Sequence, residues 1–369
     1  MYLRLFFATV LSLNFGFWAS SVRASGEPSE HSSLVTIKQN LQANGAENFN
    51  PILEAPPVIP IAPPSPTPEE PKELITPVSK LEEMKLENIQ TDFSNEQDNN
   101  GQRNQFIQTT SQFRMNNGQK FLFKTGANSF VMPGVESVTN IPFQIGWEGK
   151  IDTVKIQPSI GIDLFNRLPV AINLHLNAEV PITPSLTLSV AIDHEPYKSS
   201  AKVLENGISS WRYGPSLYWQ IDPKTSLFSM YRRGNYNDGN TENQSFSRLE
   251  RKIGQFSVSA NLFTWAYAQD INSKSGYFSP PDFLIYSGEL AWEGNVTEFL
   301  RCRLSVSLGE QRANGKMSSG NGYQSRCTIK VSPTIEADLG YALSSEQSRS
   351  VSTGGYSSRS ITGQLRLSF

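Results

Sequence analysis

The sequence predicts an all-β chain: a transmembrane antiparallel up-and-down β-barrel of about fourteen strands, preceded by a disordered Pro-rich N-terminal extension. Three observations carry this prediction: a C-terminal strand with one apolar face, period-two alternation from residue 119 onward, and connections that alternate between long and short. A hydrophobic content of 38% does not exclude a membrane protein, because a barrel strand turns half of its residues toward a polar interior.

The last nine residues, 361–369, alternate perfectly between apolar or small and polar side chains. One face carries Ile361, Gly363, Leu365, Leu367 and Phe369, and the other carries Thr362, Gln364, Arg366 and Ser368. This ending resembles the C-terminal signal of bacterial outer-membrane β-barrels, in which the last strand finishes on an aromatic residue. The resemblance implies outer-membrane lipid and the barrel assembly machinery as partners.

The N-terminal 117 residues differ from the rest in composition. Arg4, an apolar run at 5–18 and small residues up to Ala24 predict a secretory signal peptide over 1–24. Residues 25–117 predict a disordered periplasmic segment, with a polyproline-type spacer at 51–77 and a helical spacing at 81–89 too short to be stable alone. The segment is either a tether or a docking site for peptidoglycan or a periplasmic partner.

Residues 118–369 predict the barrel itself. Alternation is clear at 119–128, 141–148, 154–164, 170–180 and 186–192, and each stretch belongs to an expected strand of about ten or more residues, which is long enough to cross a bilayer when tilted. Less regular strands are expected at 211–221, 227–236, 245–251, 256–268, 283–293, 299–308, 323–331, 335–343 and 358–369. The connection at 166–167 is unexpectedly short and the strand at 245–251 is weak, so counts of twelve or sixteen stay open.

Connection lengths support a barrel over a soluble β-sandwich. Long polar connections are expected at 194–210, 237–244, 269–282, 309–322 and 344–356, and short ones at 181–185, 222–225, 252–255, 294–298 and 332–334. Their regular alternation is typical of extracellular loops and periplasmic turns. Sandwich strands average about five or six residues, and their connections need not alternate in length.

Charged side chains of both signs fall on the face that the alternation assigns to the interior. The predicted pore-lining charges are Arg301, Arg303, Arg326, Lys330, Arg366, Glu336 and Asp338, with Lys155, Arg212, Glu148, Asp163, Glu179 and Glu289 elsewhere on the wall. The four arginines among the pore-lining charges fall in one sector of the last four strands. They form either a wall held by ion pairs or a selectivity element for anionic solutes and acidic sugars.

Aromatic side chains also point inward on one expected strand. Phe263, Trp265 and Tyr267 alternate toward the interior, and Tyr218 does so on another strand. Two interpretations stay open: a track on which sugar rings stack, or a cluster packed beneath an extracellular loop that folds into the barrel.

The two cysteines fall on the lipid-facing side of consecutive strands. Cys302 and Cys327 are equally distant from a hairpin midpoint near Asn314 and Gly315, which places them directly opposite each other. Either a cross-strand disulfide, which an oxidising compartment permits, or a pair of small apolar residues is expected.

Several function classes find no support. A net charge of −2 provides no basic surface for nucleic acid, and two cysteines exclude a multi-cysteine zinc motif, so no cofactor is expected. The three histidines, His31, His175 and His194, lie in no catalytic motif. His175 and Asp193 could meet on neighbouring strands, but no nucleophile is marked, and we expect no enzyme.

Residues 276–283, Gly-Tyr-Phe-Ser-Pro-Pro-Asp-Phe, resemble the signature of the C-terminal barrel of the bacterial cellulose-synthase outer-membrane export subunit. The resemblance covers roughly 211–369 and includes the aromatic strand at 259–267. It implies a conduit for exopolysaccharide, with polysaccharide and a synthase or periplasmic protein as partners. The chain lacks the period of about 34 residues of the tetratricopeptide repeats that precede the barrel in that family. A general solute porin or a structural outer-membrane protein is the alternative.

Overall fold

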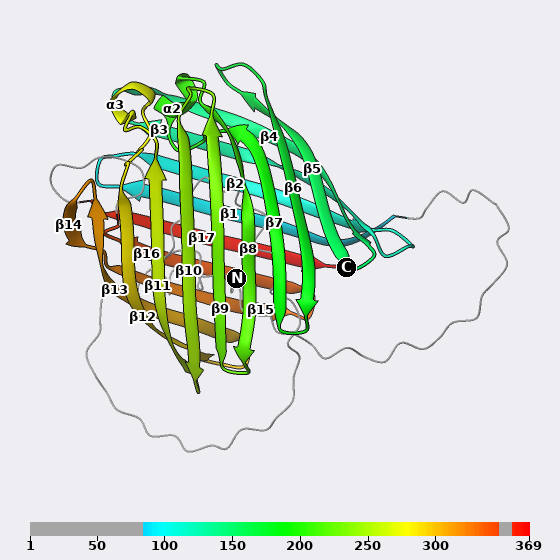
Figure 1. Cartoon of the computed structure of the whole chain (residues 1–369). Helices are drawn as coiled ribbons and strands as arrows, with labels where there is room; N and C mark the ends of the chain where they lie inside the picture. Colours follow the sequence, from blue (N-terminus) through cyan, green and yellow to red (C-terminus); the bar gives the residue numbers. More distant parts are fainter. Residues whose placement is uncertain (1–83, 347–355) are drawn as a thin grey trace, which may run out of the picture. The chain divides into compact units, whose positions relative to one another are not determined.

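The computed structural model describes residues 84–346 and 356–369, in which seventeen β-strands form one antiparallel sheet (Figure 1). Apart from β14, each strand pairs with its neighbours along the chain, and β17 pairs with β1, so the sheet closes on itself. The short strand β14 pairs only with the end of β13, which also pairs with β15. Sixteen strands therefore form the closed wall, and β14 is an addition to it.

The strands are β1 (Lys85–Asp98), β2 (Arg103–Arg114), β3 (Lys120–Met132), β4 (Val135–Ile151), β5 (Val154–Phe165), β6 (Ala171–Thr183), β7 (Leu186–Pro196), β8 (Ser209–Asp222), β9 (Thr225–Tyr236), β10 (Thr241–Ile253), β11 (Phe256–Tyr267), β12 (Phe283–Asn295), β13 (Leu300–Ala313), β14 (Lys316–Ser319), β15 (Gly322–Ser332), β16 (Ile335–Ser344) and β17 (Ser358–Ser368). Two short helices, α2 (Ala201–Glu205) and α3 (Asn272–Ser275), lie in connections. Neither of these helices is long and apolar enough to cross a membrane.

The expected count of about fourteen strands is wrong, because β1 and β2 lie within residues assigned by composition to the disordered segment. The barrel begins at Lys85 rather than at 118, and the helical spacing at 81–89 leads into a strand. The physical reason is that these two strands carry Thr, Asn and Gln on both faces, so their alternation is hidden. The predicted signal peptide and the proline-rich stretch lie outside the described residues.

Two other expectations about strands and connections change. The weak strand at 245–251 is the full-length strand β10, and the long connection expected at 237–244 is a turn at 237–240. The inner and outer faces of β10 both carry polar residues, which again weakens the sequence pattern.

The two ends of the barrel differ in their connections. At one end, the turn end, two-residue connections join strands at 152–153, 184–185, 223–224, 254–255 and 333–334, and β1 begins and β17 ends there. Asp152 (φ 56°) and Gly254 (φ 64°) supply the left-handed backbone that tight hairpin turns require. At the other end, the loop end, residues 197–208 and 268–282 form long connections that contain α2 and α3.

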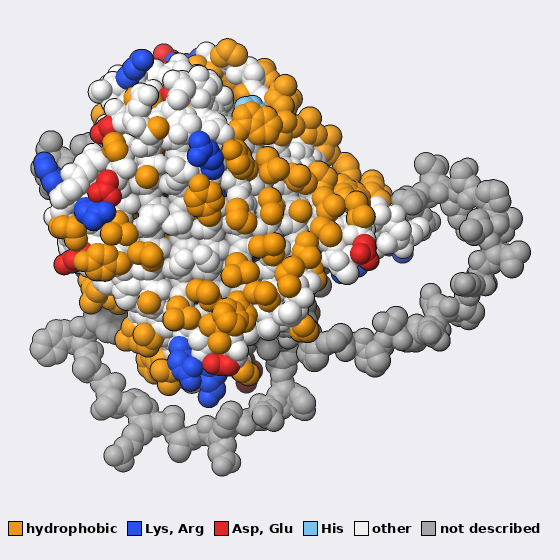
Figure 2. All heavy atoms as spheres, viewed as in Figure 1, with side chains coloured by type: hydrophobic (Ala, Val, Ile, Leu, Met, Phe, Trp, Pro, Cys, Tyr) orange, Lys and Arg blue, Asp and Glu red, His pale blue; other side chains and the backbone are white. Residues whose placement is uncertain are grey.

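The outer wall is apolar and carries aromatic residues toward both ends. Figure 2 shows hydrophobic side chains spread over this wall, with most charged side chains near its edges. Exposed tyrosines lie nearer the loop end, namely Tyr213, Tyr231, Tyr286, Tyr323 and Tyr341. Trp147, Trp219 and Trp292 lie nearer the turn end, where the indoles of Trp147 and Trp292 donate to Gln119 and Gln255. An apolar band between two aromatic belts is typical of a barrel wall in contact with a bilayer.

The expected opposition of the two cysteines across the hairpin is confirmed, and of the two interpretations left open the structure contains the disulfide. Cys302 on β13 and Cys327 on β15 are direct register partners with Cα atoms 4.1 Å apart, and they form a disulfide. Their outward neighbours Leu304 and Val306 are exposed, which places the bond on the outer face. The hairpin midpoint therefore lies where the sequence placed it.

Candidate functional site

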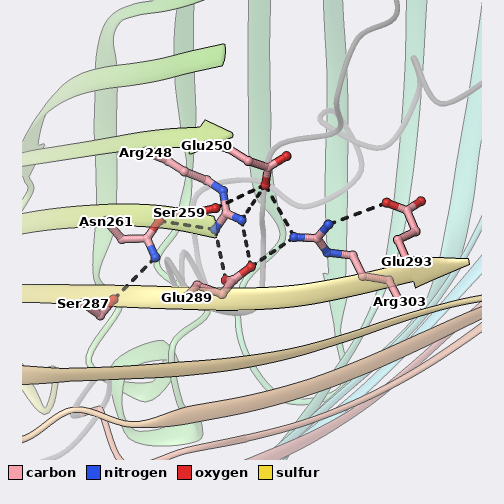
Figure 3. A network of polar contacts seen from close by, with 8 residues as sticks. All are labelled: Arg248, Glu250, Ser259, Asn261, Ser287, Glu289, Glu293 and Arg303. Carbon is pink, nitrogen blue, oxygen red and sulfur yellow. Dashed lines mark hydrogen bonds and ion pairs between the residues drawn. The ribbon is translucent and has the colours of Figure 1, made fainter. Parts of the chain in front are cut away.

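The interior wall carries a continuous network of charged and amide side chains on β10 to β13 (Figure 3). The Arg248 guanidinium lies 2.8 Å from both Glu250 and Glu289, and Arg303 lies 3.0 Å from Glu289. Ser259 is the register partner of both Glu250 and Glu289. Its small side chain leaves room above it for the Arg248 guanidinium to contact both carboxylates. Arg303 also contacts Glu293, which in turn contacts Arg301, so three guanidinium groups balance three carboxylates in the network.

The arginines expected to form an anion-selective sector each contact a carboxylate. Arg303 contacts Glu289, and Arg301 lies 2.7 Å from Glu293. Arg326 lies 3.1 Å from Asp338, and Arg366 lies 2.9 Å from Glu336. Lys330 is the register partner of Glu336. The sector is thus brought together as expected, and its geometry favours the wall of ion pairs over a positively charged selectivity element.

The opposite sector of the wall places His175 beside Asp193. His175 Nδ1 lies 3.0 Å from Asp193 Oδ1, and Ser159 is the register partner of His175 on the other side. Within the described residues Ser159 has a hydrogen bond with Gln144 and none with His175, so a nucleophile and base are not coupled. Residues 84–346 and 356–369 also contain no group of acidic, His or Cys side chains arranged to hold a metal ion.

The predicted row of aromatic side chains faces the interior, but residues of two loop-end connections cover it. Phe263, Trp265 and Tyr267 are buried within one cluster with Tyr236 and Tyr277. The Trp265 indole donates to Glu242 at 2.7 Å, and the hydroxyls of Tyr236 and Tyr267 are 3.1 Å apart. The rings therefore pack beneath the loops, and none of the three inward-facing aromatic side chains is exposed as an open sugar track would require.

The connection at 268–282 provides much of that cover, and it contains the Gly-Tyr-Phe-Ser-Pro stretch. Tyr277 is 1% exposed, and its hydroxyl donates to Asp238 at 3.0 Å. Burial raises the pKa of the Tyr277 phenol, which keeps it neutral. Gly276 (φ 85°) ends α3 in the left-handed conformation and turns the chain inward. The Gly-Tyr-Phe-Ser-Pro stretch thus forms the buried part of this loop.

The connection at 197–208 is held to the wall by a buried ion pair. Lys198 Nζ lies 3.1 Å from Asp163 on β5 and 3.2 Å from Glu195, and Asp163 is fully buried. Asn140 and Asn173 donate to the two oxygens of Asp163 at 2.7 Å and 2.9 Å. Asp163 was expected on the interior wall, whereas Lys198 was missed because nothing local distinguishes it from a solvated loop lysine.

The same loop reaches strands far from its own ends. The Ser199 carbonyl accepts from Asn104 on β2 at 2.9 Å, although the loop leaves the wall between β7 and β8. Helix α2 buries Ala201 and Leu204 against Phe130 and Val138 of β3 and β4. The loop therefore crosses the interior at the loop end.

The two connections also contact each other, and we call residues 197–208 and 268–282 together the loop cap. Asn206 donates to the Ser275 carbonyl at 2.9 Å, and the rings of Tyr197 and Tyr277 meet edge to face at 5.3 Å. Val203 of α2 packs in the aromatic cluster beneath. The loop cap joins the sector of β2 to β5 to that of β9 to β12 and so narrows one end of the interior.

No protein-family model and no curated protein matches the chain. Among solved structures it is similar to the "Bacterial polysaccharide outer membrane secretin", with a TM-score of 0.63 and 9% identity over 77% of this chain and 98% of that one. It is also similar to OccK5 (OpdH) of Pseudomonas aeruginosa (TM-score 0.43, 9% identity, 77% and 98% covered) and OccAB3 of Acinetobacter baumannii (TM-score 0.44, 9% identity, 78% and 99% covered). The first similarity identifies the fold as that of an outer-membrane β-barrel.

Proposed function

We propose that the protein is an outer-membrane channel whose polar interior conducts solute between the periplasm and the cell exterior. The observation that carries the proposal is the combination of an apolar outer wall with a charged, amide-rich inner wall in a closed sheet of sixteen strands. Charged side chains of both signs are costly in a dry protein core because they lose their hydration, whereas they are compatible with an inner wall that faces water. By the usual orientation of such barrels, the turn end faces the periplasm.

Exopolysaccharide is the solute class we favour, for outward export. The secretin with the similar fold is named for polysaccharide, and the Gly-Tyr-Phe-Ser-Pro stretch resembles the export subunit of cellulose synthases. Amide side chains such as Gln108 and Asn177 line the wall and can exchange hydrogen bonds with sugar hydroxyls. A synthase or periplasmic partner and the barrel assembly machinery belong to the same proposal. General solute diffusion is the alternative.

Location and fold are tested first. We expect the full chain to fractionate with outer membranes and to migrate faster on a gel unheated than boiled, because a closed barrel resists detergent. Recovery of the protein in the soluble periplasmic fraction would contradict the channel proposal.

Transport is tested in planar bilayers with the same protein. Cello-oligosaccharides or other neutral oligosaccharides should interrupt the single-channel current for measurable times, whereas a general porin should show only brief block in proportion to solute size. A deletion strain should lose surface polysaccharide and regain it when the chain is supplied. Normal surface polysaccharide after deletion would favour the porin alternative.

A further inference from the structure

Among the outer-face arginines that lack the carboxylate partners found inside, two lie close together. Arg359 on β17 and Arg103 on β2 are exposed side chains at the loop end. Gln97 on β1 is the register partner of both, so the three residues lie side by side across adjacent strands. With neighbouring strands about 4.8 Å apart, the two arginine Cα atoms lie about 10 Å from each other.

Neutral amides are the partners of both guanidinium groups. Arg359 donates to Gln97 Oε1 at 2.7 Å, and Arg103 donates to Asn95 Oδ1 at 2.8 Å. Within residues 84–346 and 356–369, no carboxylate forms an ion pair with either arginine. On the same end of the outer wall, Arg312 does have one, at 2.8 Å from Asp282. The pair therefore presents two positive charges without local compensation.

The pair lies at the height where phosphate groups of a bilayer leaflet are found. Ile361 is the register partner of the belt residue Tyr341, and Arg359 is the next outward residue toward the loop end. Exposed Ile107 and Ile361 lie on the other side of the arginines, toward the middle of the wall. Cationic side chains just beyond an aromatic belt, above apolar side chains, match a lipid that combines phosphate with acyl chains.

We propose that Arg103 and Arg359 form a binding site for the phosphorylated headgroup of an outer-leaflet glycolipid. Guanidinium groups bind phosphate oxygens through paired, charge-assisted hydrogen bonds, and hydrogen bonds to Asn95 and Gln97 hold the two side chains in place. Acyl chains of the same lipid cover Ile107 and Ile361. The site rests on the proposed placement of the loop end at the outer leaflet.

The test is a titration of the purified full chain in neutral detergent with diphosphorylated lipid A, monitored by native mass spectrometry. We expect the double variant Arg103→Gln/Arg359→Gln to bind at least about tenfold more weakly, because two charged hydrogen-bond donors are lost. Arg233→Gln is the matched control, since Arg233 lies outward at the same end and contacts a neutral amide, Asn243, but stands alone. It should change affinity by less than about twofold.

Two further binding measurements identify the ligand. Lipid A stripped of phosphate should bind wild type no better than it binds the double variant, and inorganic phosphate at millimolar concentration should not displace lipid A. Equal binding of diphosphorylated lipid A by wild type and double variant, or full displacement by inorganic phosphate, would overturn the site. Gel mobility unheated and single-channel conductance of the same samples report on the proposed function, so loss of the barrel or channel is distinguished from loss of the lipid site alone.

Discussion

The two ends of the barrel are stabilised in different ways. At the loop end, Lys198, Trp265 and Tyr277 are buried and hold long connections across the interior. At the turn end, tight hairpins need no such contacts, and ion pairs such as Lys155 with Glu148, at 3.3 Å, lie on a partly exposed wall. The same kind of ion pair is therefore expected to matter much more at the loop end, where water does not replace a lost partner.

The largest effect is expected for the aromatic cluster. Trp265→Ala removes a buried ring and leaves Glu242 without its indole donor, which should cost about 3–5 kcal/mol of loop-end stability. Hydrogen exchange at 268–282 measures the loss. Trp219→Ala, on the exposed outer face near the turn end, is the control and should leave exchange at 268–282 unchanged. Equal exchange in both variants would remove the distinction between the two ends.

The buried ion pair should come next. Lys198→Met leaves the carboxylate of Asp163 buried, at a cost of about 3 kcal/mol, and should release residues 197–208 from the wall. Faster hydrogen exchange in this loop and a higher single-channel conductance are the expected readouts.

Lys155→Met is the matched control at the turn end. Both members of its ion pair are partly exposed, so the change should cost less than about 1 kcal/mol and leave the conductance as in wild type. A larger effect from Lys155 than from Lys198 would reverse our account of the two ends.

Assembly tests the turn end in another way. Phe369 is 71% exposed on the outer face, and its amide donates to the Glu87 carbonyl across the closing seam. We expect Phe369→Ser to reduce the amount of heat-modifiable barrel in outer membranes several-fold, because the terminal aromatic is lost from the apolar face. Ser368→Ala should assemble normally. Normal assembly of both variants would show that the terminal aromatic is dispensable.

The smallest expected effect depends on pH at the loop end. Glu346 is buried beside Gly320, and burial raises the pKa of its carboxyl group from 4.5 to about 8. Because the protonated form is favoured when the chain is folded, its contribution to stability is full below pH 4.5 and is lost as pH rises through about 8.

Hydrogen exchange at Gly320 and Ser345 should therefore accelerate, beyond the intrinsic pH dependence of exchange, between pH 4.5 and about pH 8 in wild type. Glu346→Gln remains neutral and should abolish this excess acceleration. Persistence of the excess in the variant would assign it to another group.

Much of the wall could be predicted from the sequence, because the alternation of apolar and polar residues with period two indicates which residues face lipid. The register that pairs Cys302 with Cys327 followed from counting alone. Strands β1 and β2 escaped detection because Thr91 and Thr109, on their outer faces, are polar and satisfy each other by a hydrogen bond of 3.0 Å. Such a pairing is invisible until both strands are placed in the sheet.

The sequence by itself determined the barrel class, its C-terminal strand and the inward direction of Arg303, Trp265 and the other wall residues, because alternation is a local property of an extended chain. Only the tertiary structure decided what those residues do. Arg303 meets Glu289 and Glu250 from other strands, Trp265 is covered by two loops, and Lys198 finds Asp163 from a distant position in the chain. Contacts of this kind depend on closure of the sheet, which brings together residues whose spacing along the chain carries no signal.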